Sequence, residues 1–216
     1  LTQPTVCELR LQRHAPKMER FTTLCSARFV ASAHPMQLEP TTMKALEDAS
    51  DDYRTEQAMR ITGGEAQEGW NTYLNEVFET ERAAKLAGYK QAQVYFDTNN
   101  NPDSVRKYRI LEKEANARLL QARVDFARRH PASIPAAYWM DREICTLFIH
   151  SAEELESMAA LVQACPDTAR VNAVNRHLQT ALKYALHRPY VDFDLTLPDG
   201  QTARFSSLVP KEADYT

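Results

Sequence analysis

The sequence is poor in glycine, the residue that several common active-site motifs require. It holds five glycines in 216 residues, and the first of them is Gly63. Gly63 and Gly64 are not followed by the glycine and lysine of a phosphate-binding loop. A Gly-x-Ser-x-Gly nucleophile motif is also absent. The sequence therefore supports neither a phosphate-binding loop nor a serine hydrolase of that type.

No pair of cysteines forms a Cys-x-x-Cys motif, which argues against a local redox site and against a zinc knuckle. The four cysteines are Cys7, Cys25, Cys145 and Cys165. In an oxidising compartment they could pair in three ways, and Cys7 and Cys25 could be neighbours across a hairpin. We interpret Cys145 and Cys165 as buried free thiols that act as small apolar residues.

Histidine spacing gives no sign of a metal site. No two of the six histidines stand four residues apart on a helix, and none flanks a cysteine cluster. His130 and His150 sit at helix boundaries, where such side chains often act as caps. The six are His14, His34, His130, His150, His177 and His187. We expect no catalytic, cofactor-binding or metal-binding residues and no cofactor.

Acidic residues also give no site. The pairs Glu153/Glu154 and Asp192/Asp194 are of a kind expected on protein surfaces. A role in acid–base catalysis would depend on the relative positions of these side chains, which a sequence does not give. The acids within residues 41–60 indicate a solvated face or a frayed helix. The stretch 97–103 has the carboxylate and amide spacing of a calcium loop, but a proline stands where that loop needs glycine.

Charge and hydropathy exclude two further classes of function. The chain has 26 Lys and Arg against 29 Asp and Glu, so it has no general attraction to nucleic acid or to anionic membranes. No apolar run approaches the ~18 residues of a membrane span. With 44% hydrophobic and 25% charged residues, the composition is that of an ordinary globular protein.

The stretch from Ser104 to His130 has the strongest helical pattern. Its apolar residues recur every three or four positions, which places them on one helix face, with Arg123 and other charged residues mostly elsewhere. Such a stripe needs partners from neighbouring segments. The stripe consists of Val105, Tyr108, Leu111, Ala115, Leu119, Ala122 and Phe126.

Four other segments show helical signals. Periodicity begins at Glu65, and we interpret Trp70 and Tyr73 as packing residues. Asp103 or Ser104 is expected to cap the central helix, whereas Ser133 caps the next helix with Pro135 in its first turn. Residues 151–154 form a capping box, and a last helix covers about 168–186. Short connections favour antiparallel neighbours.

Strand patterns lie at both ends of the chain. Residues 6–11 alternate apolar and polar, and 21–30 are rich in β-formers, so we expect a small sheet that ends at a flexible Gly63-Gly64 joint. Near the C-terminus, 190–197 alternates strictly, Pro198-Asp199-Gly200 signals a turn, and 202–205 can return as a second strand. An isolated hairpin is marginal in water and needs a larger sheet.

The sequence thus predicts a mainly α (α+β) fold. It is an irregular bundle of about five helices with a small N-terminal β region and a C-terminal β-hairpin. We divide the chain into a β-rich region (1–62), a helical domain (63–188) and the truncated start of a further domain (189–216).

Residues 191–196, the turn 198–200 and Phe205-Ser206-Ser207-Leu208 resemble the opening of peroxiredoxin- and TlpA/ResA-type thioredoxin-like domains. The preceding part resembles the region in front of such domains in bacterial envelope proteins of the AhpC/TSA family, a domain of unknown function. In those proteins, a joint that resembles residues 61–64 and a sequence phrase that resembles residues 126–133 recur. In this chain His130 replaces the usual asparagine of that phrase, and the Cys-x-x-Cys is absent.

The resemblance implies an extracytoplasmic parent protein, periplasmic or associated with the cell envelope, with thiol:disulfide oxidoreductase activity. This chain would be its non-catalytic N-terminal accessory domain, which positions the redox module or mediates protein contacts. Its partners would be that module, another protein or a second copy in a homodimer, without nucleic acid. The alternatives are a stand-alone helical binding or scaffold protein, and an enzyme with an unrecognised helical pocket.

Overall fold

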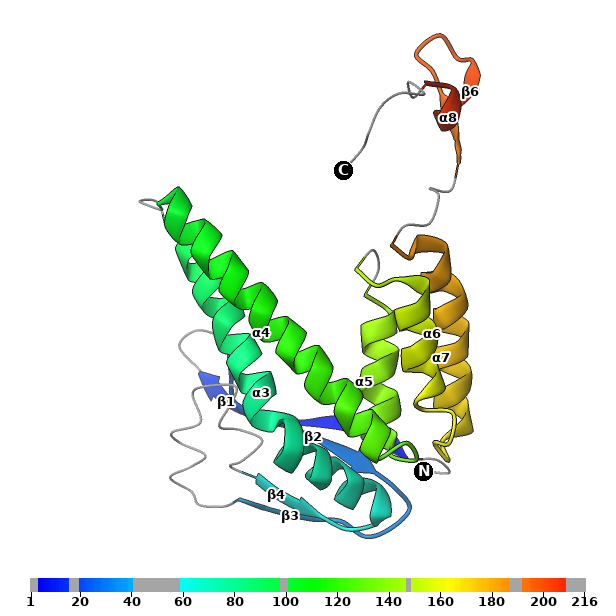
Figure 1. Cartoon of the computed structure of the whole chain (residues 1–216). Coiled ribbons are helices and arrows are strands. Elements are labelled where there is room, and N and C mark those ends of the chain that lie inside the picture. The colour runs from blue at the N-terminus through cyan, green and yellow to red at the C-terminus, as the bar shows by residue number, and fades with distance from the viewer. Residues whose placement is uncertain are drawn as a thin grey trace.

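The computed structural model describes residues 4–15, 20–40, 59–97, 101–146, 149–186 and 192–208. Helices dominate, and small antiparallel strand pairs lie toward both ends, which confirms the predicted mainly α (α+β) class (Figure 1). The elements are β1 (Thr5–Ala15), β2 (Arg20–Ala31), β3 (Gln37–Pro40), β4 (Met59–Thr62), α3 (Glu65–Tyr95), α4 (Pro102–Arg129), α5 (Ile134–Ile144), α6 (Ala152–Ala160), α7 (Thr168–Ala181), the 3₁₀ turn η2 (Leu182–Tyr184), β5 (Asp194–Thr196), β6 (Thr202–Arg204) and α8 (Phe205–Leu208).

The N-terminal strands form two antiparallel pairs, β1 with β2 and β3 with β4. The register places Cys7 opposite Phe29, whereas Cys25 lies opposite Leu11. Four residues along a strand span about 13 Å, which is too far for a disulfide. Cys7 is a free thiol. The predicted strands are therefore confirmed, but this register excludes a Cys7–Cys25 disulfide.

The glycine pair before α3 is tightly packed rather than a loose joint, which corrects that expectation. Gly63 and Gly64 have φ angles of 123° and 78°, in the region that favours glycine. A β-carbon on Gly63 would lie 2.3 Å from the carbonyl oxygen of Pro35. The buried Gln67 side chain then ties the sheet to the helix, because its Oε1 accepts a hydrogen bond from the Val30 N–H at 2.8 Å.

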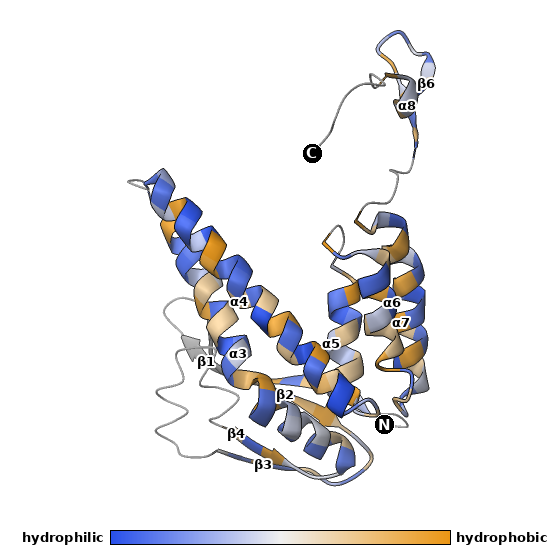
Figure 2. Cartoon of the chain, viewed as in Figure 1, coloured by the Kyte–Doolittle hydropathy of each residue, from blue (hydrophilic) through white to orange (hydrophobic). Residues whose placement is uncertain are grey.

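Helices α3 and α4 form a long antiparallel pair, coloured cyan to green in Figure 1. The predicted stripe of α4 is buried at Ala115, Leu119 and Phe126, but Leu111 is 41% exposed. In Figure 2 both ribbons alternate between hydrophilic and hydrophobic residues along their length, as amphipathic helices do. Arg123 corrects the prediction for the polar face, because it is buried and only 8% exposed.

The helix caps largely follow the sequence signals. Ser133 accepts a hydrogen bond from the N–H of Ala136, and Ser151 and Glu154 form the complete capping box of α6. The cap of α4 differs from the prediction, because Asn101 rather than Asp103 or Ser104 occupies that position. The acids of 41–58 and the centre of the rejected calcium loop, 98–100, lie outside the described residues.

The core extends from β2 through α7, and its aromatic part lies where α3, α4 and α5 meet β2. Trp70 and Tyr73 are both fully buried, which confirms them as packing residues. The Tyr73 ring stacks on Trp139 at 5.6 Å and meets Phe126 edge-on at 5.2 Å. These contacts join three helices through one tyrosine ring.

A buried network of charges crosses this aromatic core. Glu81 of α3 is 3% exposed and accepts hydrogen bonds from Arg28 Nη2 at 2.9 Å and from the Tyr73 hydroxyl at 3.1 Å. Arg123 of α4 donates to Tyr73 and to Glu143, and its guanidinium lies 3.6 Å from the centre of the Trp139 ring. One carboxylate therefore connects β2 and α4, and Arg123 extends the network to α5.

The ionisation of Glu81 depends on its arginine neighbours. Burial alone would raise the pKa of Glu81, but the positive charges of Arg28 and Arg123 outweigh it and hold the pKa below its ordinary value of 4.5. When the pKa of a carboxyl is lower in the folded than in the unfolded chain, the carboxyl stabilises the fold at any pH above its unfolded-state pKa. This stabilisation is lost as the pH falls through its folded-state pKa. The fold should therefore weaken in acid below about pH 4.5.

Hairpin β5–β6 lies apart from the helices in Figure 1. It closes as predicted, with Gly200 at φ 85° and a hydrogen bond from the Leu197 N–H to the Gln201 carbonyl. Phe193 and Phe205 stack on each other at 5.0 Å, but Phe193 remains 50% exposed. The hairpin thus leaves an apolar surface uncovered.

Removal of the buried carboxylate is a direct test of the core network. Glu81→Ala should lower the free energy of unfolding by about 3–5 kcal/mol, because it leaves Arg28 and Arg123 without their shared partner. Urea unfolding followed by circular dichroism measures the change. The matched control is Glu79→Ala on the same helix, where the Glu79–Arg82 pair is exposed and the loss should stay within about 0.5 kcal/mol. Equal losses in both variants would contradict a stabilising role for the network.

Candidate functional site

The start of α3 and the turn between α4 and α5 meet at one open pocket of about 540 Å³. Glu65, Ala66 and Gly69 from the start of α3 line one side, directly after the glycine pair. Residues 129–134, between α4 and α5, line another side, and His34 from the β2–β3 loop lies at the same pocket. Segments about 65 residues apart in the sequence therefore form one surface.

Glu76 fixes the end of α4 beside this pocket. Arg129 Nη2 donates a hydrogen bond to Glu76 at 2.6 Å, and His130 Nε2 lies 2.9 Å from the other carboxylate oxygen. The hydrogen bond from Arg129 lowers the pKa of Glu76, with a further contribution from His130. Side chains that bind each other in this way hold the turn in place. They do not form an acid–base pair with a reacting group.

The described thiols do not come together. Cys7 lies on β1, Cys145 caps the C-terminal end of α5, and Cys165 lies between α6 and α7, and all three are free. Cys165 is buried as predicted, but Cys145 is exposed, which corrects its interpretation as a buried thiol. Disulfide exchange needs a reactive thiolate with a second sulfur, and the described part of the chain shows no such pair.

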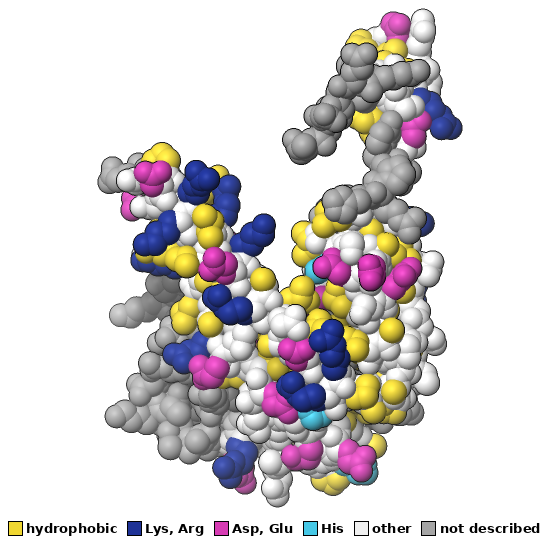
Figure 3. Space-filling model, in the orientation of Figure 1, with side chains coloured by type: hydrophobic (Ala, Val, Ile, Leu, Met, Phe, Trp, Pro, Cys, Tyr) yellow, Lys and Arg dark blue, Asp and Glu magenta, His cyan; other side chains and the backbone are white. Residues whose placement is uncertain are grey.

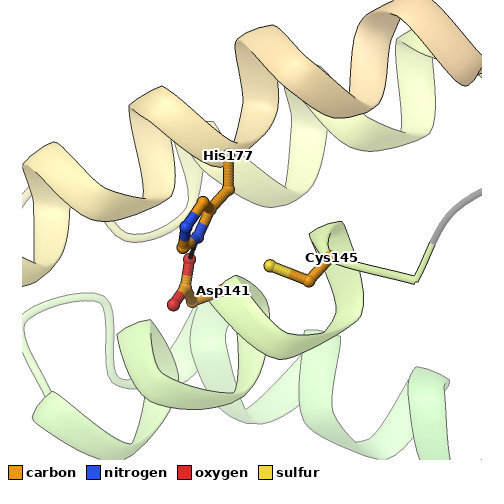
Figure 4. A group of neighbouring side chains, drawn as sticks. All are labelled: Asp141, Cys145 and His177. Atoms are coloured by element: carbon orange, nitrogen blue, oxygen red, sulfur yellow. Dashed lines mark hydrogen bonds and ion pairs between the residues drawn. The ribbon is translucent and has the colours of Figure 1, made fainter.

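Cys145 instead lies beside an aspartate and a histidine (Figure 4). Asp141 is one helical turn earlier on α5, and His177 reaches across from α7. The Nδ1 atom of His177 is 2.7 Å from an oxygen of Asp141, and one ligand atom from each of the three residues lies within 4.8 Å of the others. These are the side-chain types that bind transition metals.

The thiols of Cys145 and Cys165 are not activated. Burial raises the pKa of both, and for Cys145 the neighbouring Asp141 carboxylate raises it further. A nucleophilic cysteine needs the opposite, a pKa lowered by positive charge. The Asp141–Cys145–His177 cluster is therefore not organised as a nucleophile with its base.

A second hollow lies between α4 and α6, with a volume of about 300 Å³. In Figure 3 hydrophobic side chains gather in the cleft between the α3–α4 pair and the α5–α7 bundle. His150 lines this hollow and is 5% exposed, and its Nε2 has no hydrogen-bond partner in the structure. The adjacent Glu153 and Glu154 are exposed, as the sequence predicted.

The spacing of residues in the sequence predicted none of these groupings of side chains. His177 is 32 positions from Cys145, so no rule for neighbours on one helix brings the two together. The i, i+4 spacing of Asp141 and Cys145 was the one local signal available.

Among the described residues no helix is long and apolar enough to span a membrane, as the absence of a long apolar run in the sequence indicated.

Thiol labelling tests the placement of the cysteines. In the native protein iodoacetamide should modify Cys145 readily and Cys165 only after unfolding in urea, because Cys165 is buried. The Cys145 thiol should react more slowly at neutral pH than free cysteine, since its pKa is raised. Peptide mass spectrometry over time measures both rates. Equal labelling of Cys145 and Cys165 in the native state would contradict the structure.

Comparison with protein families, with curated proteins and with solved structures finds no match for this chain. Function must therefore be argued from the geometry described above together with the resemblance of its sequence phrases.

Proposed function

We propose that this chain is a non-catalytic accessory region of a thioredoxin-like thiol:disulfide oxidoreductase of the bacterial cell envelope, and that it positions the redox module. The exposed apolar surface of hairpin β5–β6 is the observation that carries this proposal. A two-stranded hairpin alone is marginal in water. Phe193 beside β5 is 50% exposed and Leu208 of the following α8 is 49% exposed, so the hairpin and α8 have apolar surface that a larger sheet would cover.

The position of the hairpin supports the same role. It lies apart from the helical body in Figure 1, and its Phe193 side chain is half exposed. The Phe193 and Phe205 rings stack on each other, and Asp192 accepts hydrogen bonds from Ser206. These contacts preorganise the segment that resembles the opening of a thioredoxin-like domain.

The helical body supports a positioning role through its rigidity. The Glu81 network and the aromatic core join β2 with α3, α4 and α5. The separation of the described thiols, together with the raised pKa of Cys145 and of Cys165, agrees with a region that leaves the redox chemistry to another module. A rigid body of this kind suits a carrier whose task is to hold a module in one place.

A stand-alone binding protein is the second candidate. The hollow between α4 and α6 favours it, because apolar Leu120, Val124 and Met158 line the hollow together with the unpartnered His150. In this alternative the hairpin would pack on the body of the same chain, whereas an accessory region leaves the hairpin free for the redox module.

The gene itself gives the most direct test. A Cys-x-x-Cys should be encoded within about thirty residues after Thr216, which is the length of one strand–helix–strand unit. A signal peptide should be encoded upstream. A reading frame that stops near Thr216 would overturn the accessory role and favour the stand-alone protein.

Substitutions of two phenylalanines in this chain distinguish the accessory region from the stand-alone binding protein. Phe193→Ala in the hairpin should change the free energy of unfolding of the helical body by less than about 0.5 kcal/mol, because the Phe193 ring stacks on Phe205 of its own segment. The matched variant Phe126→Ala should cost about 3–5 kcal/mol, since Phe126 is 1% exposed. Urea unfolding by circular dichroism measures both. A loss above about 1 kcal/mol for Phe193→Ala would place the hairpin on the body and favour the alternative.

The chain should also lack reductase activity of its own. In an insulin reduction assay with dithiothreitol, it should not accelerate turbidity above dithiothreitol alone, because its described thiols lie on separate elements and do not form a pair. A thioredoxin serves as the positive control. Turnover that disappears in Cys145→Ser or in Cys7→Ser would contradict the non-catalytic role.

A further inference from the structure

The cluster of Asp141, Cys145 and His177 contains three different metal-ligand types on two packed helices. Each residue offers one ligand atom, and the three atoms lie within 4.8 Å of one another. Figure 4 shows the three side chains directed toward one another in the space between α5 and α7. Neither the sequence pattern nor the proposed accessory role accounts for this grouping.

The backbone beneath the cluster is well fixed. On α5 the cap residue Cys145 donates its N–H to the Asp141 carbonyl at 3.1 Å, and the adjacent Ile144 is fully buried. On α7 the residues Val174 and Ala181 are buried on either side of His177 in the sequence. Two packed helices thus present the ligands, so a metal would require little reordering of the chain.

The three ligand atoms are close enough together for side-chain adjustments to bring them around a small tetrahedral ion. Zinc binds sulfur at about 2.3 Å and nitrogen or oxygen at about 2.0–2.2 Å, so ligand atoms around it lie roughly 3.3–3.7 Å apart. The His177 nitrogen and the Asp141 oxygen are 2.7 Å apart and would separate slightly as the ion replaces the proton between them. Cys145 would move inward by rotation of its side chain.

We propose that Asp141, Cys145 and His177 form a Zn²⁺ site that bridges α5 and α7. One thiolate, one imidazole and one carboxylate form a donor set that suits zinc, whereas calcium and magnesium prefer oxygen ligands alone. Three protein ligands leave the fourth position to water. When the ion binds, the thiol proton leaves to solvent, so the ion and its ligands together carry no net charge.

A bound ion would join two helices that now meet through packing and one hydrogen bond. Because the ion binds the folded chain and the assembled site is absent after unfolding, it should raise the melting temperature, and the increase should grow with the logarithm of the free zinc concentration above the dissociation constant. The position is partly open, since Cys145 is exposed and Asp141 and His177 are half-buried. Zinc can therefore enter without unfolding of the body.

Calorimetric titration of the reduced protein with ZnCl₂ tests the site. One ion should bind per chain, and Cys145→Ser, His177→Gln and Asp141→Asn should each weaken binding by about tenfold or more. The matched controls are Cys7→Ser, which removes another thiol, and Asp125→Asn, which removes a half-buried carboxylate on α4. Both controls should bind zinc like the parent chain. Circular dichroism of each variant establishes that it is folded.

Two measurements on the unmutated chain avoid dependence on the variants. Co²⁺ should give an absorption band from cobalt–thiolate charge transfer together with the strong visible bands of tetrahedral cobalt. Saturating Zn²⁺ should protect Cys145 from iodoacetamide while Cys7 is labelled at an unchanged rate. No binding, a cobalt spectrum without thiolate ligation, or binding that the three ligand variants leave unchanged would each overturn the zinc site.

The outcome is separable from the proposed accessory function. The zinc experiments concern α5 and α7, whereas the accessory role rests on the hairpin and on the sequence beyond Thr216. A failure of zinc binding would leave the hairpin argument unchanged. A gene without a redox motif would leave the zinc site unchanged.

Discussion

The carboxylate of Glu81 is the constraint on which the rest of the structure depends. A charge with 3% exposure is costly unless opposite charges accompany it. Arg28 of β2 and Arg123 of α4 supply those charges, and Arg123 also contacts Tyr73, Glu143 and Trp139. Because the pair partners come from different elements, the network is satisfied only when β2, α3, α4 and α5 sit in one arrangement. That arrangement determines where the α4–α5 turn lies and hence forms the pocket beside Glu76.

The sequence predicted what depends on near neighbours. The caps at Ser133 and Ser151, the buried half of the α4 stripe and the turn at Gly200 each follow from residues within a few positions of one another. Arg123 was assigned to the polar face because a helix pattern treats arginine as a surface residue. Its burial depends on Glu81 and Glu143, which lie 42 and 20 positions away in the sequence. No local pattern carries that information.

The same limit applies to the candidate sites. Asp141 and Cys145 share a helix face, but their histidine partner comes from α7, and only the packing of the two helices brings it close. Gly63 and Gly64 suggested a joint, since glycine pairs often punctuate chains. The structure gives them another reason, because the backbone of Pro35 approaches Gly63 too closely for any side chain. The sequence alone does not distinguish a glycine that is required by such a close approach from a glycine in a flexible linker.

The state of Cys145 connects the zinc site with the accessory role. An exposed thiolate beside a redox module would enter mixed disulfides, because thiolates attack disulfide sulfur. Here the partial desolvation of the Cys145 sulfur and the charge of Asp141 raise the pKa of this exposed residue, which favours the thiol over the thiolate. A zinc ion would stabilise the thiolate but occupy its lone pair, which again removes it from disulfide exchange. With or without the ion, this sulfur is expected to be a poor nucleophile in disulfide exchange, which is compatible with the proposed accessory role.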